Sequence, residues 1–188
     1  MSTKEKIRVR RFEIKDLEAV KALIERTINV CYGDYYLKEV IDFFGMFHWD
    51  GNILKTAQDG FVAVAEVNAK IAATGSLMDD FILRVFVDPR HQKKGLGRMI
   101  MDELERQAAA RGVKVLQLRS LASSRKFYET LGYKTIEQRF EEVDNGSFLE
   151  YHKMVKEIGD VLGKLSRAEK ICRDGCANRD ATQQKGKD

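Results

Sequence analysis

Hydrophobic and polar residues follow a period of two at the start of the chain and a helical period soon afterwards. Residues 7–14 read IRVRRFEI, an alternation that predicts a strand. From Leu17 to about Val30 the apolar residues recur at helical spacing, and Asp16 stands where a capping side chain is expected. A second helical segment, YYLKEVIDFF, ends at Gly45.

The period of two returns in the middle of the chain. FVAVAEV and IAATGSLM are β-rich runs joined by residues 68–70, which predicts a hairpin. The loop before Gly60 is expected to contain a short helix. A further strand covers about Phe81–Val87 and stops at Asp88-Pro89, because proline cannot donate to a strand ladder.

Helices and strands alternate in the second half of the chain. A helix is predicted from Gly95 to Arg111, with Gly112 at its C-terminal end. The strand VKVLQLRS follows, and then a helix over about residues 123–131. KTIEQRFEEV and SFLEYHKMV flank residues 144–146, Asp-Asn-Gly, which is a strong hairpin signal. Hairpins combined with helical crossovers predict an α/β chain with a mixed sheet.

Length and composition fit one folded domain with an appendage. The chain has 188 residues, of which 44% are hydrophobic, and this is enough for a sizeable core. The periodic pattern weakens after Met154. We therefore assign residues 1–155 to the folded domain and residues 156–188 to a polar C-terminal extension that is partly helical or disordered.

Charge, hydropathy and cysteine content argue against several classes of protein. The net charge of +4 is mild and does not predict nucleic-acid binding, which usually needs a concentrated basic face. The N-terminus lacks the apolar core of a secretion signal, and no apolar run predicts a membrane span. Cys31, Cys172 and Cys176 show no disulfide or metal-site spacing, so we expect a cytoplasmic protein with reduced thiols and no metal.

The turn after residue 87 carries candidate chemistry. The first N–H groups of a helix have no partner within it and lie at the positive end of the helix dipole. Gly95 and Gly97 leave those groups open, and Lys93, Lys94 and Arg98 add positive charge. The turn therefore predicts a phosphate or pyrophosphate site. The alternative is an ordinary turn with strain-relieving glycines and solvated lysines.

Two widespread phosphate-binding motifs do not fit this turn. A nucleotide-triphosphate P-loop needs G-x-x-x-x-G-K-S/T, which the chain lacks. A dinucleotide fingerprint needs a third glycine at the position where Ile100 stands.

Two motifs resemble the GNAT superfamily of N-acetyltransferases. Residues 92–97, QKKGLG, are similar to the family's Q/R-x-x-G-x-G/A turn, and they lie between a strand ending V-x-P and a long amphipathic helix. Residues 127–133, FYETLGY, are similar to the family's F-Y-x-x-x-G-F/Y element. The resemblance extends from residue 6 to about residue 154. It implies a GNAT-like mixed, mostly antiparallel central sheet flanked by helices, with acetyl-CoA as cosubstrate.

The resemblance also implies roles for individual residues. Tyr128 corresponds to the family's general acid, since a phenol stays protonated at neutral pH and can pass its proton to a departing thiolate. A backbone amide of residues 85–87 would stabilise the oxyanion. The coenzyme-binding residues implied in this way are Val85, Phe86, Val87, Gln92, Lys93, Lys94, Gly95, Leu96, Gly97, Arg98, Ser123 and Phe127.

Two departures from the family pattern affect the predicted site. Leu83 stands where many members carry a catalytic Glu, and Leu121 stands where an Asn often contacts the coenzyme. Ser123 or Ser124 would then supply the missing contact. We favour Asp80 as a base acting through ordered water. The other polar groups nearby, each more often an ordinary surface charge, are Asp79, Arg84, Glu141 and Glu142.

The acceptor pocket is expected in the region between the first strand and the hairpin, where aromatic residues are dense. Tyr32, Tyr36, His48 and Trp49 are the candidate acceptor-binding residues. Helix packing is an alternative explanation for most of this aromatic cluster.

Three functions compete at this point. The first is an acetyl-CoA-dependent N-acetyltransferase acting on a primary amine of a small molecule or peptide, with a homodimer as an open option. The second is a non-catalytic acyl-CoA-binding sensor or interaction module, which the absence of an obvious base motivates. The third is a nucleic-acid-binding or partner-binding protein that uses the C-terminal extension.

Overall fold

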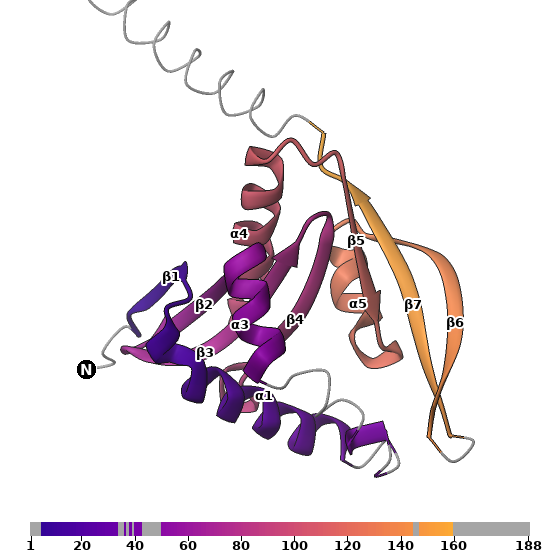
Figure 1. Ribbon diagram of the computed structural model, residues 1–188, viewed down its shortest axis with the longest axis horizontal. Coiled ribbons are helices and arrows are strands. Elements are labelled where there is room, and N and C mark those ends of the chain that lie inside the picture. The colour runs from indigo at the N-terminus through magenta and orange to yellow at the C-terminus, as the bar shows by residue number, and fades with distance from the viewer. Residues whose placement is uncertain are drawn as a thin grey trace, which may run out of the picture.

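A computed structural model of the protein describes residues 5–33, 36, 38, 40–42, 50–144 and 147–159. Its centre is a seven-stranded sheet with the strand order β1-β2-β3-β4-β5-β7-β6 (Figure 1). The strands are β1 (Ile7–Arg11), β2 (Phe61–Val67), β3 (Lys70–Met78), β4 (Phe81–Val87), β5 (Val115–Ser120), β6 (Lys134–Asp144) and β7 (Ser147–Glu157). The helices are α1 (Leu17–Tyr32), α3 (Asp50–Asp59), α4 (Leu96–Ala110) and α5 (Ala122–Thr130), with short 3-10 turns η1 (Ile14–Asp16) and η2 (Pro89–His91).

Neighbouring strands are antiparallel throughout the sheet except at one pair. The strands β1 to β4 form a meander, and β5, β7 and β6 form a second antiparallel group. The two groups meet where β4 and β5 run parallel, because α4 makes the crossover between these strands. This arrangement confirms the predicted mixed, mostly antiparallel sheet.

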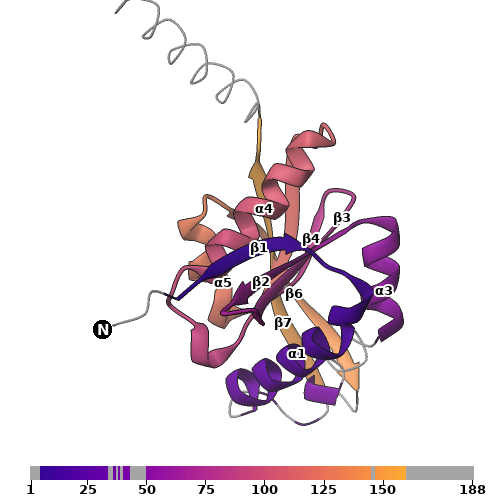
Figure 2. The ribbon, with the colours of Figure 1, turned by 90° about the vertical axis from the view of Figure 1, so that its left-hand side faces the viewer.

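Helices cover both faces of the sheet. The helices α4 and α5 pack on one face, in a core that includes Ile100 and Leu104. The helices α1 and α3 pack on the other face, around Leu23 and Ile53. Figure 2 shows α1 and α3 on the opposite side of the sheet from α4. The functional site is built where these two layers approach the junction of β4 and β5.

The hairpin predicted from the central alternating runs is β2–β3. Asn68 and Ala69, at its turn, have φ values of 51° and 63°, and tight hairpins require such positive values at both central residues. The strand β5 begins at Val115, slightly later than the run VKVLQLRS suggested, and α1 extends to Tyr32.

Asp16 acts differently from the cap that its position predicted. No side-chain hydrogen bond from Asp16 caps α1. Instead Arg10 donates to both carboxylate oxygens, at 2.6 and 2.9 Å, and the Glu13 N–H donates to one of them at 2.8 Å. These hydrogen bonds, led by those from Arg10, lower the pKa of Asp16. The capping prediction was wrong because a guanidinium from β1 occupies the carboxylate.

Some predictions fall partly or wholly outside the described residues. Within the second predicted helix, residues 38 and 40–42 are helical. Residues 160–188, which make up most of the predicted C-terminal extension, are not described, and that prediction stays untested. Across the described ranges, no helix has both the length and the apolar content that crossing a membrane would require.

Candidate active site

The turn before α4 has the backbone that its sequence predicted. Gly95 occupies the N-cap position with a φ of 85°, and Lys93 has a φ of 60°. The Met99 N–H donates to the Gly95 carbonyl at 3.1 Å, so the N–H groups of residues 96–98 lie ahead of the first helical hydrogen bond. A Cβ placed on Gly95 would meet no atom within 4 Å. The helix thus begins with exposed donors beside open space, as an anion site requires.

Gly97 is a glycine for a different reason. A Cβ at this position would lie 3.1 Å from a ring carbon of Phe127 and 3.5 Å from a methyl carbon of Val87. The space beside Gly97 is therefore filled by α5 and β4. Close packing between the two helices explains this glycine, whereas backbone conformation explains Gly95.

The other residues of the turn separate into anchors and exposed charges. Leu96 is fully buried in the core beneath the turn. The Gln92 amide donates to the Val87 carbonyl at 3.2 Å, and the Lys94 ammonium lies 3.0 Å from a Glu5 carboxylate oxygen. The side chains of Lys93 and Arg98 are exposed and carry no ion pair within the described ranges.

Asp88 is a structural residue of this turn that the sequence reasoning missed. Its carboxylate is 1% exposed and pairs with Arg26 of α1 at 2.6 Å and with Arg90 at 2.7 Å. It also accepts the backbone N–H of Arg90 at 3.0 Å. Hydrogen bonds from Arg90, and then from Arg26, lower the pKa of Asp88 well below its usual range. The sequence feature that could have predicted this role is an acidic residue directly before a proline. The side chain of such a residue can cap the 3-10 turn that follows.

The parallel pair β4 and β5 separates soon after it begins. Only Phe81 and Ile82 pair with β5, although β4 continues to Val87 (Figure 1). A bulge in β4 lies opposite Gly75, where the register between β3 and β4 shifts and Arg84 takes a φ of 53°. Beyond Ile82, the edge of β4 that faces β5 therefore has no ladder partner in that strand.

A cavity of about 510 Å³ occupies the junction of the diverging strands. Apolar and aromatic side chains form most of its wall, and α1, β4, β5, α5, β6 and β7 all contribute. The lining residues are Tyr32, Phe81, Ile82, Leu83, Arg84, Val85, Phe86, Arg119, Leu121, Ser124, Tyr128, Glu141, Leu149 and Tyr151.

Tyr128 lies in the wall of this cavity. Its side chain is buried, with its ring centroid 5.1 Å from that of Phe127 and 6.0 Å from that of Tyr133. Burial, and to a smaller degree the nearby Tyr32, raises the pKa of Tyr128 above that of a free phenol. No hydrogen bond joins its hydroxyl to another residue within the described ranges. A protonated phenol therefore faces the space between the strands.

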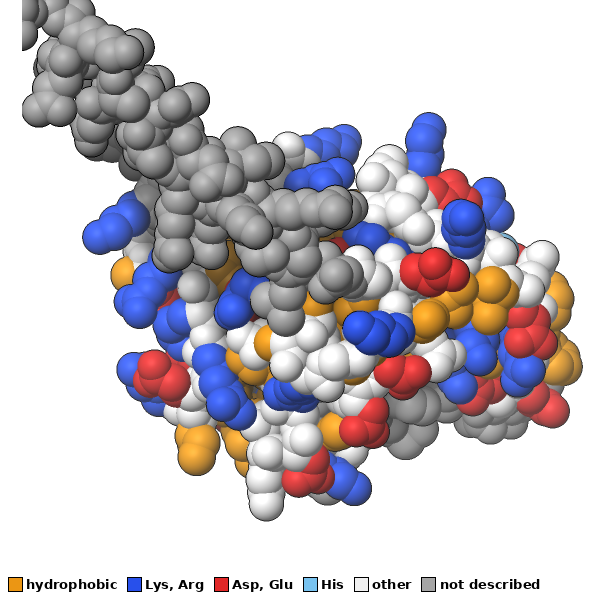
Figure 3. All heavy atoms as spheres, turned by 90° about the horizontal axis from the view of Figure 1, so that it is seen from above, with side chains coloured by type: hydrophobic (Ala, Val, Ile, Leu, Met, Phe, Trp, Pro, Cys, Tyr) orange, Lys and Arg blue, Asp and Glu red, His pale blue; other side chains and the backbone are white. Residues whose placement is uncertain are grey.

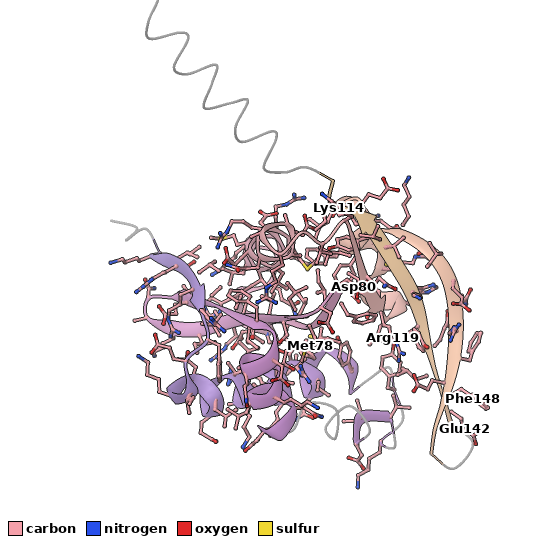
Figure 4. The ribbon with its side chains drawn as sticks, turned by 45° about the horizontal axis from the view of Figure 1, so that its top comes forward. Met78, Asp80, Lys114, Arg119, Glu142 and Phe148 are labelled. Carbon is pink, nitrogen blue, oxygen red and sulfur yellow. The ribbon has the colours of Figure 1, made fainter. Side chains whose placement is uncertain are left out.

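The carboxylate in the cavity wall is that of Glu141, whereas the sequence analysis favoured Asp80 as the base. Asp80 lies at the β3–β4 turn, accepts a hydrogen bond from the Gln117 amide at 2.7 Å, and is not part of the cavity lining. Figure 4 labels Asp80 just before β4 and Arg119 on β5. Glu141 does line the cavity, 3.2 Å from Arg119. Leu83, which replaces the family's usual Glu, is in the wall as well.

The predicted acceptor residues are only partly brought together. Tyr32 lines the cavity, and its ring meets that of Tyr36 edge to face at a centroid distance of 5.8 Å. Burial raises the pKa of Tyr32 to about 12. His48 and Trp49 lie outside the described residues.

The predicted coenzyme contact from Ser123 is also not seen at the cavity. Ser123 is exposed, whereas its neighbour Ser124 lines the cavity. The Ser124 hydroxyl lies 3.1 Å from that of Ser120 and 3.3 Å from the Leu121 carbonyl. Ser124 is therefore the serine whose hydroxyl lies beside the diverging strands.

Charge is mixed on the face seen from above, and the described residues form no cluster of metal ligands. Basic and acidic side chains are interspersed over the face seen from above (Figure 3), in keeping with the mild net charge. Among the residues that the structure describes, no three His, Cys, Asp or Glu side chains gather as a metal site would need.

Comparisons with known proteins identify the family. The model of the acetyltransferase (GNAT) domain family matches residues 37–158. A Bacillus subtilis (strain 168) protein, named as a proposed acetyltransferase, is 31% identical over 105 residues, which are 55% of this chain and 67% of that protein. The chain belongs to the GNAT family of acetyltransferases.

Solved structures agree with this fold. A GCN5-related N-acetyltransferase of Rhodopseudomonas palustris superposes with a TM-score of 0.73 at 19% identity, covering 84% of this chain and 99% of that one. PaiA N-acetyltransferase of Thermoplasma acidophilum, in complex with coenzyme A, has a TM-score of 0.66 at 18% identity, covering 81% and 99%. YncA of Salmonella typhimurium, solved with its cofactor acetyl-CoA, has a TM-score of 0.61 at 20% identity, covering 82% and 95%.

Proposed function

We propose that this protein transfers the acetyl group of acetyl-CoA to a primary amine of a small molecule or peptide by direct attack. The observation that carries the proposal is the Tyr128 hydroxyl in a cavity between strands that separate beside a helix N-terminus. Membership of the GNAT family supports the reaction class, and the solved relatives with coenzyme A or acetyl-CoA support the choice of coenzyme.

The residues of the α4 turn fit the diphosphate of coenzyme A. The N–H groups of residues 96–98 are available donors, and the absence of a side chain at Gly95 leaves room for an anion beside them. Lys93 and Arg98 add exposed positive charge, whereas Lys94 already pairs with Glu5. Val85 and Phe86 would contact the pantetheine arm from β4, and Phe127 and Ser124 would do so from the α5 side.

Acetyl-CoA, when bound, supplies an activated thioester. Tyr128 would hold a proton at its phenol oxygen and donate it to the sulfur as the thiolate leaves. Its raised pKa keeps that proton in place at neutral pH. Beyond Ile82 the edge of β4 has no ladder partner in β5, and a backbone N–H there would stabilise negative charge on the carbonyl oxygen.

The acceptor amine would enter from the side of Tyr32 and lose a proton before it attacks. Glu141 is the carboxylate that the cavity wall supplies, and we propose it as the proton acceptor, directly or through water. Asp80 remains the weaker candidate because it does not line the cavity. His48 and Trp49 stay predictions.

Incubation of the protein with acetyl-CoA and a panel of primary amines tests the proposal. We expect free coenzyme A to appear only when an acceptor is present, together with an N-acetylated product in the mass spectrum. Tight binding of acetyl-CoA with no release of coenzyme A for any amine would instead support the non-catalytic acyl-CoA-binding module. That alternative is motivated by Leu83, which stands where many relatives carry the base.

A further inference from the structure

The cavity wall contains two arginines with different surroundings. Arg119 pairs with Glu141 at 3.2 Å, and its guanidinium carbon lies 4.7 Å from the centroid of the Tyr151 ring. Arg84 pairs with no carboxylate anywhere in the described ranges. One cation of the wall is therefore neutralised by the protein, and the other is not.

The hydrogen bonds of Arg84 are incomplete. A guanidinium carries five N–H donors, and one of them, on Nη1, donates to Thr56 Oγ1 at 2.9 Å. The Nε atom is fully buried and has no hydrogen-bond partner. Leaving a buried donor unpaired destabilises a protein, and more so when the group is charged. Burial also lowers the pKa of Arg84, as expected for a poorly compensated charge.

The backbone holds Arg84 in this environment. Its φ of 53° lies in the left-handed region, which is uncommon for a residue with a long side chain. The strain coincides with the β4 bulge, and bulges next to active sites commonly redirect a side chain. Thr56 is itself buried on α3 and holds one end of the guanidinium. A strained backbone together with a half-buried guanidinium whose Nε lacks a partner points to a functional group.

Arg84 lies on the acceptor side of the cavity. Its hydrogen bond reaches α3, and its neighbour Phe86 belongs to the core beneath α1 and α3. Tyr128 belongs to the opposite core layer, with α4. The guanidinium and the proposed general acid therefore approach the cavity from opposite faces of the sheet.

We propose that Arg84 binds an anionic group, a carboxylate or a phosphate, carried by the acceptor amine itself. This inference rests on the proposed transferase function and names its substrate class: amines with an anionic group on a partly apolar skeleton. An arginine suits this task because its planar fork donates two parallel hydrogen bonds to such oxygens. The unpaired donors of Arg84 would then find their acceptors only when substrate is bound.

Matched amines test the proposal by kinetics. Glycine, γ-aminobutyrate and L-phenylalanine are each compared with their carboxamides and with the corresponding aminophosphonates. We expect kcat/KM for the anionic form to exceed that for the carboxamide by about 10- to 100-fold, as for a hydrogen-bonded charge. Converting the carboxylate of an α-amino acid to a carboxamide lowers the pKa of the amine, so more of the amine is unprotonated. This effect raises kcat/KM for the neutral analogue and therefore opposes the expected preference for the anionic form. The phosphonates distinguish a phosphate site from a carboxylate site.

Variants assign the preference to Arg84. In Arg84→Gln we expect the preference to fall to within about threefold, and in Arg84→Lys to be only partly retained because the fork is lost. Lys55→Gln is the matched control, since it removes an exposed cation beside Thr56 on α3 and should leave the preference unchanged. Thermal unfolding and coenzyme affinity verify that each variant is folded.

A binding measurement separates this inference from the proposed function. Calorimetry in the presence of coenzyme A compares N-acetyl-L-phenylalanine with its amide on the wild-type protein and on Arg84→Gln. Binding of the anionic product that is lost in the variant, without turnover of any amine, would leave the anion site standing and reject the transferase. Equal kcat/KM and equal binding of anionic and neutral forms by the wild-type protein would overturn the anion site, whether or not Arg84→Gln folds.

Discussion

The proposed coenzyme site and the proposed acceptor side of the cavity are built in opposite ways. The coenzyme site is one continuous stretch, residues 92–98, whose proposed ligands are backbone N–H groups at a helix start. The acceptor side would gather Tyr32, Arg84, Arg119 and Glu141 from four different elements, and its proposed ligands are side chains.

The difference explains why one side is recognisable in the sequence and the other is not. Backbone donors do not depend on residue type, so a glycine pattern is enough to mark them. Side-chain ligands depend on which strands become neighbours. Changes on the coenzyme side should therefore alter affinity for coenzyme A whatever the acceptor is, and changes on the acceptor side should alter acceptor preference.

Tyr128→Phe should have the largest effect, because Tyr128 stands between the two sides. Removing the phenol proton is expected to lower kcat by about 100- to 1,000-fold, the range for a general acid. Coenzyme affinity should change little, since the ring and its packing remain. Initial-rate kinetics with calorimetry measure both quantities, and an unchanged kcat would remove Tyr128 from the mechanism.

Asp88→Asn should have the second largest effect, and this effect is on the stability of the fold. Removing a buried carboxylate that pairs with Arg26 and Arg90 should lower the free energy of unfolding by about 2–3 kcal/mol at pH 7. The fold lowers the pKa of Asp88, so its stabilisation is fully present above the unfolded pKa of about 4 and is lost progressively as the pH falls from there through the lowered folded pKa.

Denaturant titrations at pH 7 and pH 3 measure this effect. The advantage of the wild-type protein over Asp88→Asn should be smaller at pH 3 than at pH 7. A difference between the two proteins that stays constant across this interval would show that the ion pairs of Asp88 do not stabilise the turn.

Gly95→Ala compared with Gly112→Ala isolates the coenzyme side. Both glycines have positive φ, and a Cβ at either would meet no atom within 4 Å, so both variants should lose about 1 kcal/mol of stability through backbone strain. Only Gly95→Ala should also weaken coenzyme A binding, by about tenfold, because its methyl group enters the proposed diphosphate site. Equal affinities in calorimetry would place the diphosphate elsewhere.

The smallest effect is expected when Glu141→Gln is compared with Asp80→Asn. This comparison tests which of the two carboxylates accepts the proton of the amine. We expect Glu141→Gln to lower kcat/KM by about 3- to 10-fold near neutral pH, with the loss shrinking at high pH where the amine is already deprotonated. Asp80→Asn should stay within about twofold. A pH–rate series decides between them, and the reverse result would restore Asp80 as the base.

Much of the fold could be predicted because its signals are local. The strands β2, β3 and β4, the helix α4 and its closing Gly112 follow from the alternation of apolar residues and from glycine positions. The turn before α4 could be predicted as an anion site for the same reason, whereas the F-Y element of α5 was singled out by its resemblance to the GNAT family.

The rest could not be predicted because it depends on which residues meet in space. The roles of Asp16 and Asp88 are fixed by arginines that lie on other elements or beyond a proline. The separation of β4 from β5 lies beside a bulge opposite Gly75, which apolar periodicity does not reveal. The placement of Glu141 in the cavity wall, in preference to Asp80, depends on β7 and β6 lying next to β5 in the sheet.

The contact between Gly97 and Phe127 has a consequence for how such an enzyme can drift over evolutionary time. One end of the coenzyme would rest on the segment containing Gly97, and the residue after Phe127 would serve its other end. A larger residue at position 97 would press on the Phe127 ring, and the phenol of the next residue would tend to move with it. The spacing between nucleotide anchor and proton donor would thus depend on the packing at position 97, and we expect residues 97 and 127 to change together.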